Sequence, residues 1–204
     1  MGYERRPALT AALDGRGANP YGPAAVRSRG AMSDNTSNTE FKSAALQSHG
    51  PGKPLRGGKQ VSGLEFLQGI VKDGVSSSNF NANLGVRLIE VEQGRAVFRC
   101  EPGMQHMNAL GIVHGGLAAT LIDSATGSAV LSTQPAGGRS TTLELKVNFV
   151  RPITAKTGPV TCEAKVIHLG RRVATSDARV VDGAGKLIAH GSATIMVFPP
   201  EEGG

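Results

Sequence analysis

The stretch of residues 117–131 constrains the fold more than any other part of the chain. Its positions are apolar or small, and Asp123 is the only charged residue among them. A helix that is apolar on nearly all sides is buried on most of them, because exposed apolar surface in water is unfavourable. The rest of the domain must therefore supply elements that surround this helix.

The segments around this helix have the patterns of strands and turns. Large apolar residues at positions 143, 145, 147 and 149 alternate with polar ones, which predicts a half-buried strand. A shorter helix is predicted from Leu64 to Gly74, where glycine ends it. The other predicted strands are residues 85–92 and 95–100, which form a hairpin around Gln93–Gly94, then 159–168, 172–181 and a last strand that ends at Phe198.

This order predicts an α+β fold in which a mostly antiparallel sheet wraps around one long central helix. A single open sheet leaves an edge strand with unpaired backbone groups, so we expect two copies of the chain to extend the sheet as a homodimer. Whether such dimers pair further into a homotetramer is left open by the sequence.

Composition separates the first 60 residues from the rest. Residues 1–60 are rich in Gly, Pro, Ser, Asn and Arg, which predicts a disordered extension, and Met32 is a second candidate start within it. This segment holds nine Lys/Arg against four Asp/Glu, whereas residues 61–204 hold thirteen against twelve. The basic charge therefore lies outside the predicted domain, residues 61–200, and we expect no nucleic-acid partner.

Other classes are disfavoured by what the chain contains. Cys100 and Cys162 are too few for a disulfide framework and lack metal-ligand spacing, so we expect reduced, buried thiols and a cytoplasmic location. No apolar run is long enough to span a membrane, and no apolar segment typical of a secretory signal begins the chain. His106, His168 and His190 also lack ligand-like spacing, so no metal and no cofactor are expected.

Asp123 and the start of its helix are the candidates for chemistry. A carboxylate in an apolar setting is paired, protonated or functional, and burial would favour its action as a base; a structural, capping role is the alternative. The sequence His114-Gly115-Gly116 opens the helix, where backbone N–H groups lack internal partners and can bind an oxyanion. A glycine-rich turn without function is the alternative there, and Asn108 taken alone is typical of a turn.

The stretch of residues 108–127, NALGIVHGGLAATLIDSATG, resembles the signature of the PaaI-like (phenylacetic acid degradation) thioesterases of the hotdog-fold superfamily. The resemblance covers about residues 61–198 and continues through the segments TTLEL, NFVRP, HLGRR and DGAGKLIA, which begin at residues 141, 148, 168 and 182. It implies a hotdog fold and hydrolysis of an acyl-CoA or aryl-acyl-CoA thioester to the free acid and CoA.

The resemblance also implies roles for individual residues. Asp123 matches the general base or nucleophile, and the Gly115 N–H matches the oxyanion donor. Asn108 matches the residue that orients the thioester or the water, and His114 the residue that shapes the helix start and can bond to Asn108. Thr141, with Ser140 as its neighbour if the register differs by one, matches the residue that holds the water. The family's sites lie at the dimer interface.

Three arginines are candidates for binding CoA, and two other functions are alternatives to hydrolysis. Arg151, Arg171 and Arg172 are candidates for binding the phosphates of CoA, with solvated surface charge as the alternative. A hotdog hydratase or dehydratase is disfavoured because the central helix carries no histidine after His114. A non-catalytic acyl-CoA-binding module would need a partner domain such as a DNA-binding helix pair, and residues 1–60 lack that periodicity.

Overall fold

The computed structural model of the protein describes residues 61–200. The predicted disordered extension, residues 1–60, lies outside this range together with its alternative start at Met32, so both stay predictions. None of the helices within residues 61–200 is long and apolar enough to cross a membrane. The elements in chain order are α2 (Gly63–Asp73), α3 (Asn79–Asn83), β1 (Arg87–Glu92), β2 (Arg95–Cys100), the 3₁₀ turn η2 (Met104–His106), α4 (Gly115–Leu131), β3 (Arg139–Phe149), β4 (Val160–Leu169), β5 (Val173–Asp182) and β6 (Leu187–Phe198).

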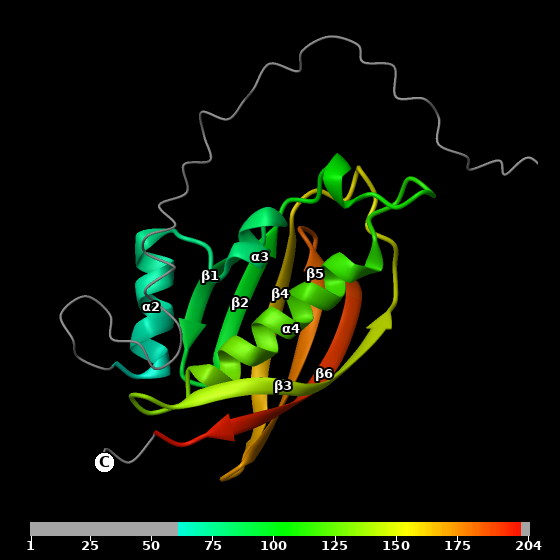
Figure 1. The fold of residues 1–204 in the computed structure, drawn as a ribbon. Coiled ribbons are helices and arrows are strands. Elements are labelled where there is room, and N and C mark those ends of the chain that lie inside the picture. Colours follow the sequence, from blue (N-terminus) through cyan, green and yellow to red (C-terminus); the bar gives the residue numbers. More distant parts are fainter. Residues whose placement is uncertain (1–60, 201–204) are drawn as a thin grey trace, which may run out of the picture. The chain divides into compact units, whose positions relative to one another are not determined.

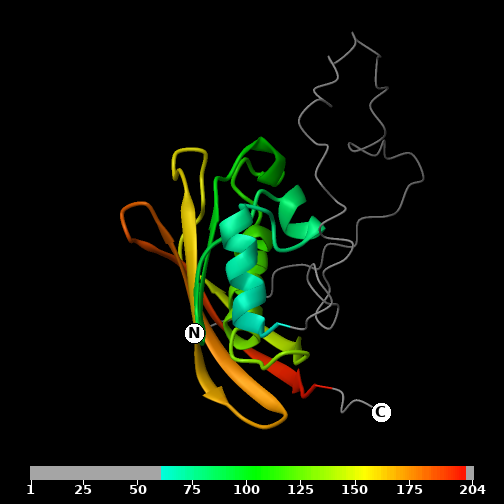
Figure 2. The same ribbon diagram turned by 90° about the vertical axis from the view of Figure 1, so that its left-hand side faces the viewer.

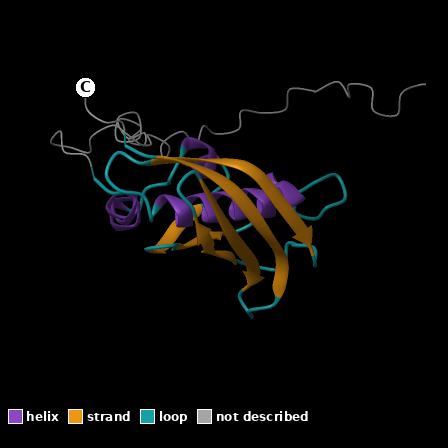
Figure 3. Ribbon diagram, turned by 90° about the horizontal axis from the view of Figure 1, so that it is seen from below, coloured by secondary structure: helices purple, strands orange, loops and turns teal. Residues whose placement is uncertain are grey.

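The helix α4 lies in the hollow of a curved sheet (Figures 1 and 3). In the described part of the chain the sheet has six strands in the order β1-β2-β4-β5-β6-β3, and every neighbouring pair is antiparallel. Leu121 and Ile122 of α4 are fully buried, as is Phe98 of β2. The predicted antiparallel sheet around one central helix is therefore confirmed.

Two short helical segments precede the sheet on the same face as α4 (Figure 2). The helix α2 begins with a capping box between Ser62 and Glu65 and ends at Gly74, which has the left-handed φ of 64° that glycine tolerates. The helix α3 was not predicted, because its five residues are too few for a helical period; its one local signal is Ser78, whose Oγ accepts from the Asn81 N–H.

The edge strand β3 departs from the predicted alternation. Its register with β6 shifts between Thr142 and Glu144, so Leu143 is an extra residue in a bulge and is 54 % exposed. Leu145 and Val147 beyond the bulge pack against the core as predicted. The bulge breaks the two-residue period, which is why Leu143 does not reach the core.

Candidate functional site

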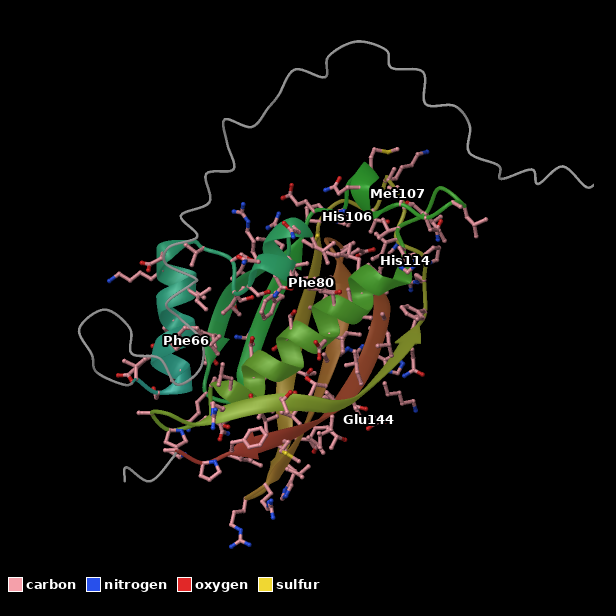
Figure 4. The ribbon with its side chains drawn as sticks, viewed as in Figure 1. Phe66, Phe80, His106, Met107, His114 and Glu144 are labelled. Atoms are coloured by element: carbon pink, nitrogen blue, oxygen red, sulfur yellow. The ribbon has the colours of Figure 1, made fainter. Side chains whose placement is uncertain are left out.

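The start of α4 presents a free backbone donor. His114 is the N-cap residue, and its Nδ1 accepts a 2.9 Å hydrogen bond from the Gly116 N–H. The backbone N–H of His114 donates to the carbonyl of His106 at 2.7 Å, which fixes the preceding loop (Figure 4). The Gly115 N–H has no hydrogen-bond partner within residues 61–200. At the positive end of the helix dipole, this N–H can therefore bind a developing negative charge.

Asp123 lies two turns further along α4 and is exposed in the single chain. The expectation of an apolar surrounding is wrong for this residue, because it faces the side of α4 that the sheet leaves open. Its Oδ1 accepts a 2.9 Å hydrogen bond from the hydroxyl of Thr142 on β3. This bond leaves Oδ2 to act on a substrate or a water molecule.

Thr142 is the residue that hydrogen-bonds to Asp123, and it was not among the site residues predicted from the sequence. Thr142 stands opposite the buried Ile195, and Thr141 stands opposite Met196. Because successive side chains of a strand point to opposite faces, Thr142 points toward α4 and Thr141 points away from it. Thr142 is identified by the register of β3 against β6, which no local pattern in the sequence reveals. The role predicted for Thr141 stays a prediction.

A pocket of about 270 Å³ opens beside Asp123 between α2, α3, α4 and β3. One wall is apolar, with Phe66 and Ile70 of α2, whereas hydroxyl and amide groups form much of the rest. Asn81, which is 5 % exposed, links α3 to α4 because its Oδ1 accepts from the Ser124 hydroxyl at 3.1 Å. The lining residues are Phe66, Leu67, Ile70, Ser77, Ser78, Asn81, Asp123, Ser124, Gly127, Ser128, Leu131, Ser140, Thr141, Thr142 and Ile195.

Asn108 forms the turn that leads to α4. Its Oδ1 accepts from the backbone N–H of Leu110 at 2.9 Å, and Gly111 follows with a left-handed φ of 74°. The side-chain oxygen of Asn108 thus stabilises a turn, in agreement with the interpretation made from Asn108 alone. The hydrogen bond recorded for the His114 ring runs to Gly116 and not to Asn108. A substrate-orienting role would rest on the amide nitrogen of Asn108 and stays a prediction.

The predicted residues do not meet within one chain. Eight positions separate Gly115 from Asp123, and a helix rises by about 1.5 Å per residue, so their backbones lie roughly 12 Å apart. The carbonyl group of one thioester is far shorter than this span. The Gly115 N–H and the Asp123 carboxylate of one chain therefore cannot act on the same carbonyl.

The three arginines also lie far apart. The backbone N–H of Arg151 bonds to the carbonyl of Ile188 near the start of β6, whereas the carbonyl of Arg172 accepts from Val197 near its end. Nine residues of strand separate these two points, which is roughly 30 Å at about 3.3 Å per residue. All three, Arg171 included, have exposed side chains. Arg151 and the pair Arg171–Arg172 therefore cannot hold one phosphate group together in a single chain.

The remaining groups of possible chemistry are structural. Burial raises the pKa of the Cys100 thiol to about 11 and raises that of Cys162 further, and both cysteines are free. His106 is buried, with Nδ1 accepting from the Gly103 N–H and Nε2 bonded to the Leu84 carbonyl. Among the residues that the structure describes, no group of three or more His, Cys, Asp or Glu is placed to hold a metal ion.

Comparison with known proteins places the chain in a family. A model of the thioesterase superfamily matches residues 110–189, which include Gly115, Asp123 and Thr142. Human acyl-coenzyme A thioesterase 13 is 30 % identical over 137 residues, which cover 66 % of this chain and 96 % of that protein.

Solved structures agree with this similarity. A variant of the phenylacetic acid degradation protein PaaI from Thermus thermophilus superimposes with a TM-score of 0.53 at 31 % identity, covering 58 % of this chain and 98 % of that chain. A thioesterase family protein from Silicibacter pomeroyi gives a TM-score of 0.58 at 27 % identity, covering 65 % and 98 %. The chain belongs to the thioesterase superfamily, has the hotdog fold and resembles the PaaI proteins within it.

Proposed function

We propose that this thioesterase hydrolyses acyl-CoA or aryl-acyl-CoA to the free acid and CoA. The observation that carries the proposal is that α4 holds two groups suited to this reaction within residues 61–200. The Gly115 N–H at its start has no hydrogen-bond partner in this range, and the exposed Asp123 carboxylate lies beside a pocket. The relation to human acyl-coenzyme A thioesterase 13 supports the CoA ester as the substrate class. The pocket beside Asp123 is the place for the acyl group.

We infer that each active site combines two copies of the chain. Gly115 and Asp123 of one chain are too far apart to act on one carbonyl, but a twofold axis beside the middle of α4 would bring Gly115 of one copy next to Asp123 of the other. The exposed or half-buried side of α4 carries the small residues Gly116, Ala119 and Gly127, which permit close helix packing. A homodimer with two sites at its interface, alone or paired into a homotetramer, follows from this arrangement.

The edge strand β3 supports the same dimer. It is an edge strand of the sheet, and Leu143 and Val150 at this edge are 54 % and 49 % exposed. Pairing of β3 with its copy would satisfy its open backbone groups and cover apolar surface. Of the two edge strands, β1 and β3, we infer that β3 pairs with its copy, because Thr142 on β3 contacts Asp123.

The reaction needs few groups. The carbonyl oxygen of the thioester lies against the Gly115 N–H of one copy, and Asp123 of the other takes a proton from water as the water oxygen attacks the carbonyl carbon. Collapse of the tetrahedral intermediate breaks the C–S bond, and the sulfur leaves as a thiolate that is then protonated. In the alternative route Asp123 attacks the carbonyl carbon itself, and water hydrolyses the resulting mixed anhydride. Thr142 holds the carboxylate in place in either route.

Binding of CoA and cellular location complete the proposal. Arg151 and the pair Arg171–Arg172 are separate candidates for the phosphates, and two copies would bring different arginines toward each site. The free, buried thiols of Cys100 and Cys162 support a reducing, cytoplasmic environment.

A panel of acyl-CoA esters with a thiol reagent tests the activity. We expect release of the CoA thiol for at least one compact acyl group. Binding of acyl-CoA, measured by calorimetry, without thiol release from any ester would contradict the proposal and favour a non-catalytic binding module.

Mixed dimers test the shared site. Asp123→Asn and Gly115→Pro each inactivate both sites of their own dimer, but a mixed dimer keeps one site with an intact Gly115 and an intact Asp123. We expect dissociation and reassociation of the two inactive variants to restore activity to one site per mixed dimer. Mixed dimers without activity would overturn the shared site.

A further inference from the structure

Phe149 lies directly against the residue with the free N–H. A β-carbon placed at Gly115 would lie 3.1 Å from Cε1 and 3.1 Å from Cζ of the Phe149 ring. Phe149 is the last residue of β3 and stands opposite the buried Ala189, so its side chain points toward α4. Phe149 is nevertheless 61 % exposed in the single chain. An aromatic ring thus flanks the proposed oxyanion donor and leaves most of its own surface open.

The position of the ring matters for the strength of that donor. Fewer water molecules reach an N–H that lies beside an apolar group. A hydrogen bond from that N–H to a developing negative charge is stronger in such surroundings. The neighbouring donor, the Gly116 N–H, is already occupied by His114 Nδ1, so the carbonyl oxygen depends on the Gly115 N–H at this helix start. Sulfur also makes favourable contacts with aromatic rings, and the thioester carries its sulfur next to the carbonyl.

We propose that Phe149 is a substrate-contacting residue whose ring forms the apolar wall of the oxyanion site and excludes water from the Gly115 N–H. The inference rests on the proposed function, in which that N–H receives the thioester oxygen. It also bears on the glycine at position 115, because a β-carbon there would lie 3.1 Å from the ring, which would have to shift by a few tenths of an ångström.

Substitution at position 149 tests the proposal. Phe149→Ala admits water to the Gly115 N–H, and we expect kcat to fall about tenfold or more while KM changes less. The reason is that the hydrogen bond from this N–H to the carbonyl oxygen strengthens as negative charge develops on that oxygen. Phe149→Leu keeps an apolar wall and should stay within about threefold of the natural chain. Phe198→Ala removes another exposed phenylalanine from the end of a strand and should leave kcat and KM unchanged. Sedimentation and thermal unfolding of each variant confirm an intact assembly.

The outcomes separate the inference from the proposed function. If the natural chain releases no thiol from any acyl-CoA, the proposed function fails. If the natural chain is active and Phe149→Ala keeps the same kcat, the role of Phe149 is overturned and the proposed function stands.

A double substitution decides the matter if Phe149→Ala loses its assembly. Gly115→Ala keeps the N–H but pushes the new methyl group against the ring, so we expect a loss of activity of a few-fold. The double variant Gly115→Ala, Phe149→Leu relieves this contact and should be more active than Gly115→Ala alone. Independent, multiplying losses from the two substitutions would overturn the proposal.

Discussion

Replacing Gly115 by proline would remove one N–H from the start of α4 while leaving the helix in place. Gly115 is the first helical residue, and proline is favoured at this position because its missing N–H has no helical partner. The preceding residue, His114, has φ −60° and ψ 134°, which is the extended backbone that a following proline requires. The substitution therefore isolates the donor from the fold.

The size of the effect follows from the loss of this donor. The Gly116 N–H is held by His114, so Gly115→Pro removes the N–H at the start of α4 that the described structure leaves free for an oxyanion. Loss of one such donor costs about 100- to 1,000-fold in kcat, or about 3–4 kcal/mol of transition-state stabilisation. We expect this loss in thiol release from the best acyl-CoA of the panel, at saturating substrate.

Gly115→Ala is the matched control for this loss. Both substitutions place a β-carbon about 3.1 Å from the Phe149 ring, but only proline lacks the N–H. The ratio of the two kcat values therefore measures the hydrogen bond without the steric contact. If the two variants have equal kcat values, or if Gly115→Pro keeps the activity of the natural chain, the assignment of the oxyanion donor is refuted.

Four further outcomes can be measured directly. Asp123→Asn keeps an oxygen that can accept the Thr142 hydrogen bond, so we expect unchanged thermal unfolding and a fall in kcat of about 100-fold or more. The control Asp177→Asn, at an exposed position, should leave kcat unchanged. Near-normal turnover of Asp123→Asn would show that Asp123 takes no part in the reaction. Thr142→Ala should lower kcat about tenfold and Thr142→Ser should restore it, and Thr141→Ala measured in the same assay decides which hydroxyl serves. Gly191→Ala drives a β-carbon into the Lys146 carbonyl oxygen and should destabilise the fold by about 2 kcal/mol or more. Gly69→Ala, inside α2, meets open space and should stabilise the fold by up to about 1 kcal/mol in denaturant unfolding. Burial raises the pKa of the Cys100 thiol to about 11 and that of Cys162 higher, and the reactive thiolate forms only as the pH approaches the pKa. A thiol reagent at a pH of about 8 should therefore modify neither cysteine until denaturant is added. Rapid labelling of the folded chain would contradict the burial of the two thiols.

Local patterns along the chain are enough to predict the helices and strands and their broad arrangement. The apolar stretch 117–131 required a surrounded helix, and two-residue alternation and turn residues located the strands, because both signals are local in the chain. The single charge at Asp123 and the glycines at 115 and 116 also identified the helix that carries the candidate site. The hotdog fold and the thioesterase family were implied by the resemblance of residues 61–198 to the PaaI-like thioesterases.

Contacts between segments that are distant in the chain depend on how the whole domain packs. The register of β3 against β6 placed Thr142 rather than Thr141 at Asp123, and the bulge at Leu143 turned a predicted core residue outward. The open side of α4 exposed Asp123, whose apolar neighbours in sequence had suggested burial. The contact of Phe149 with Gly115 joins residues 34 positions apart, so no local pattern could reveal it. Strand register and helix orientation are set by packing of the whole core, and they decide which of the candidate residues meet at the site.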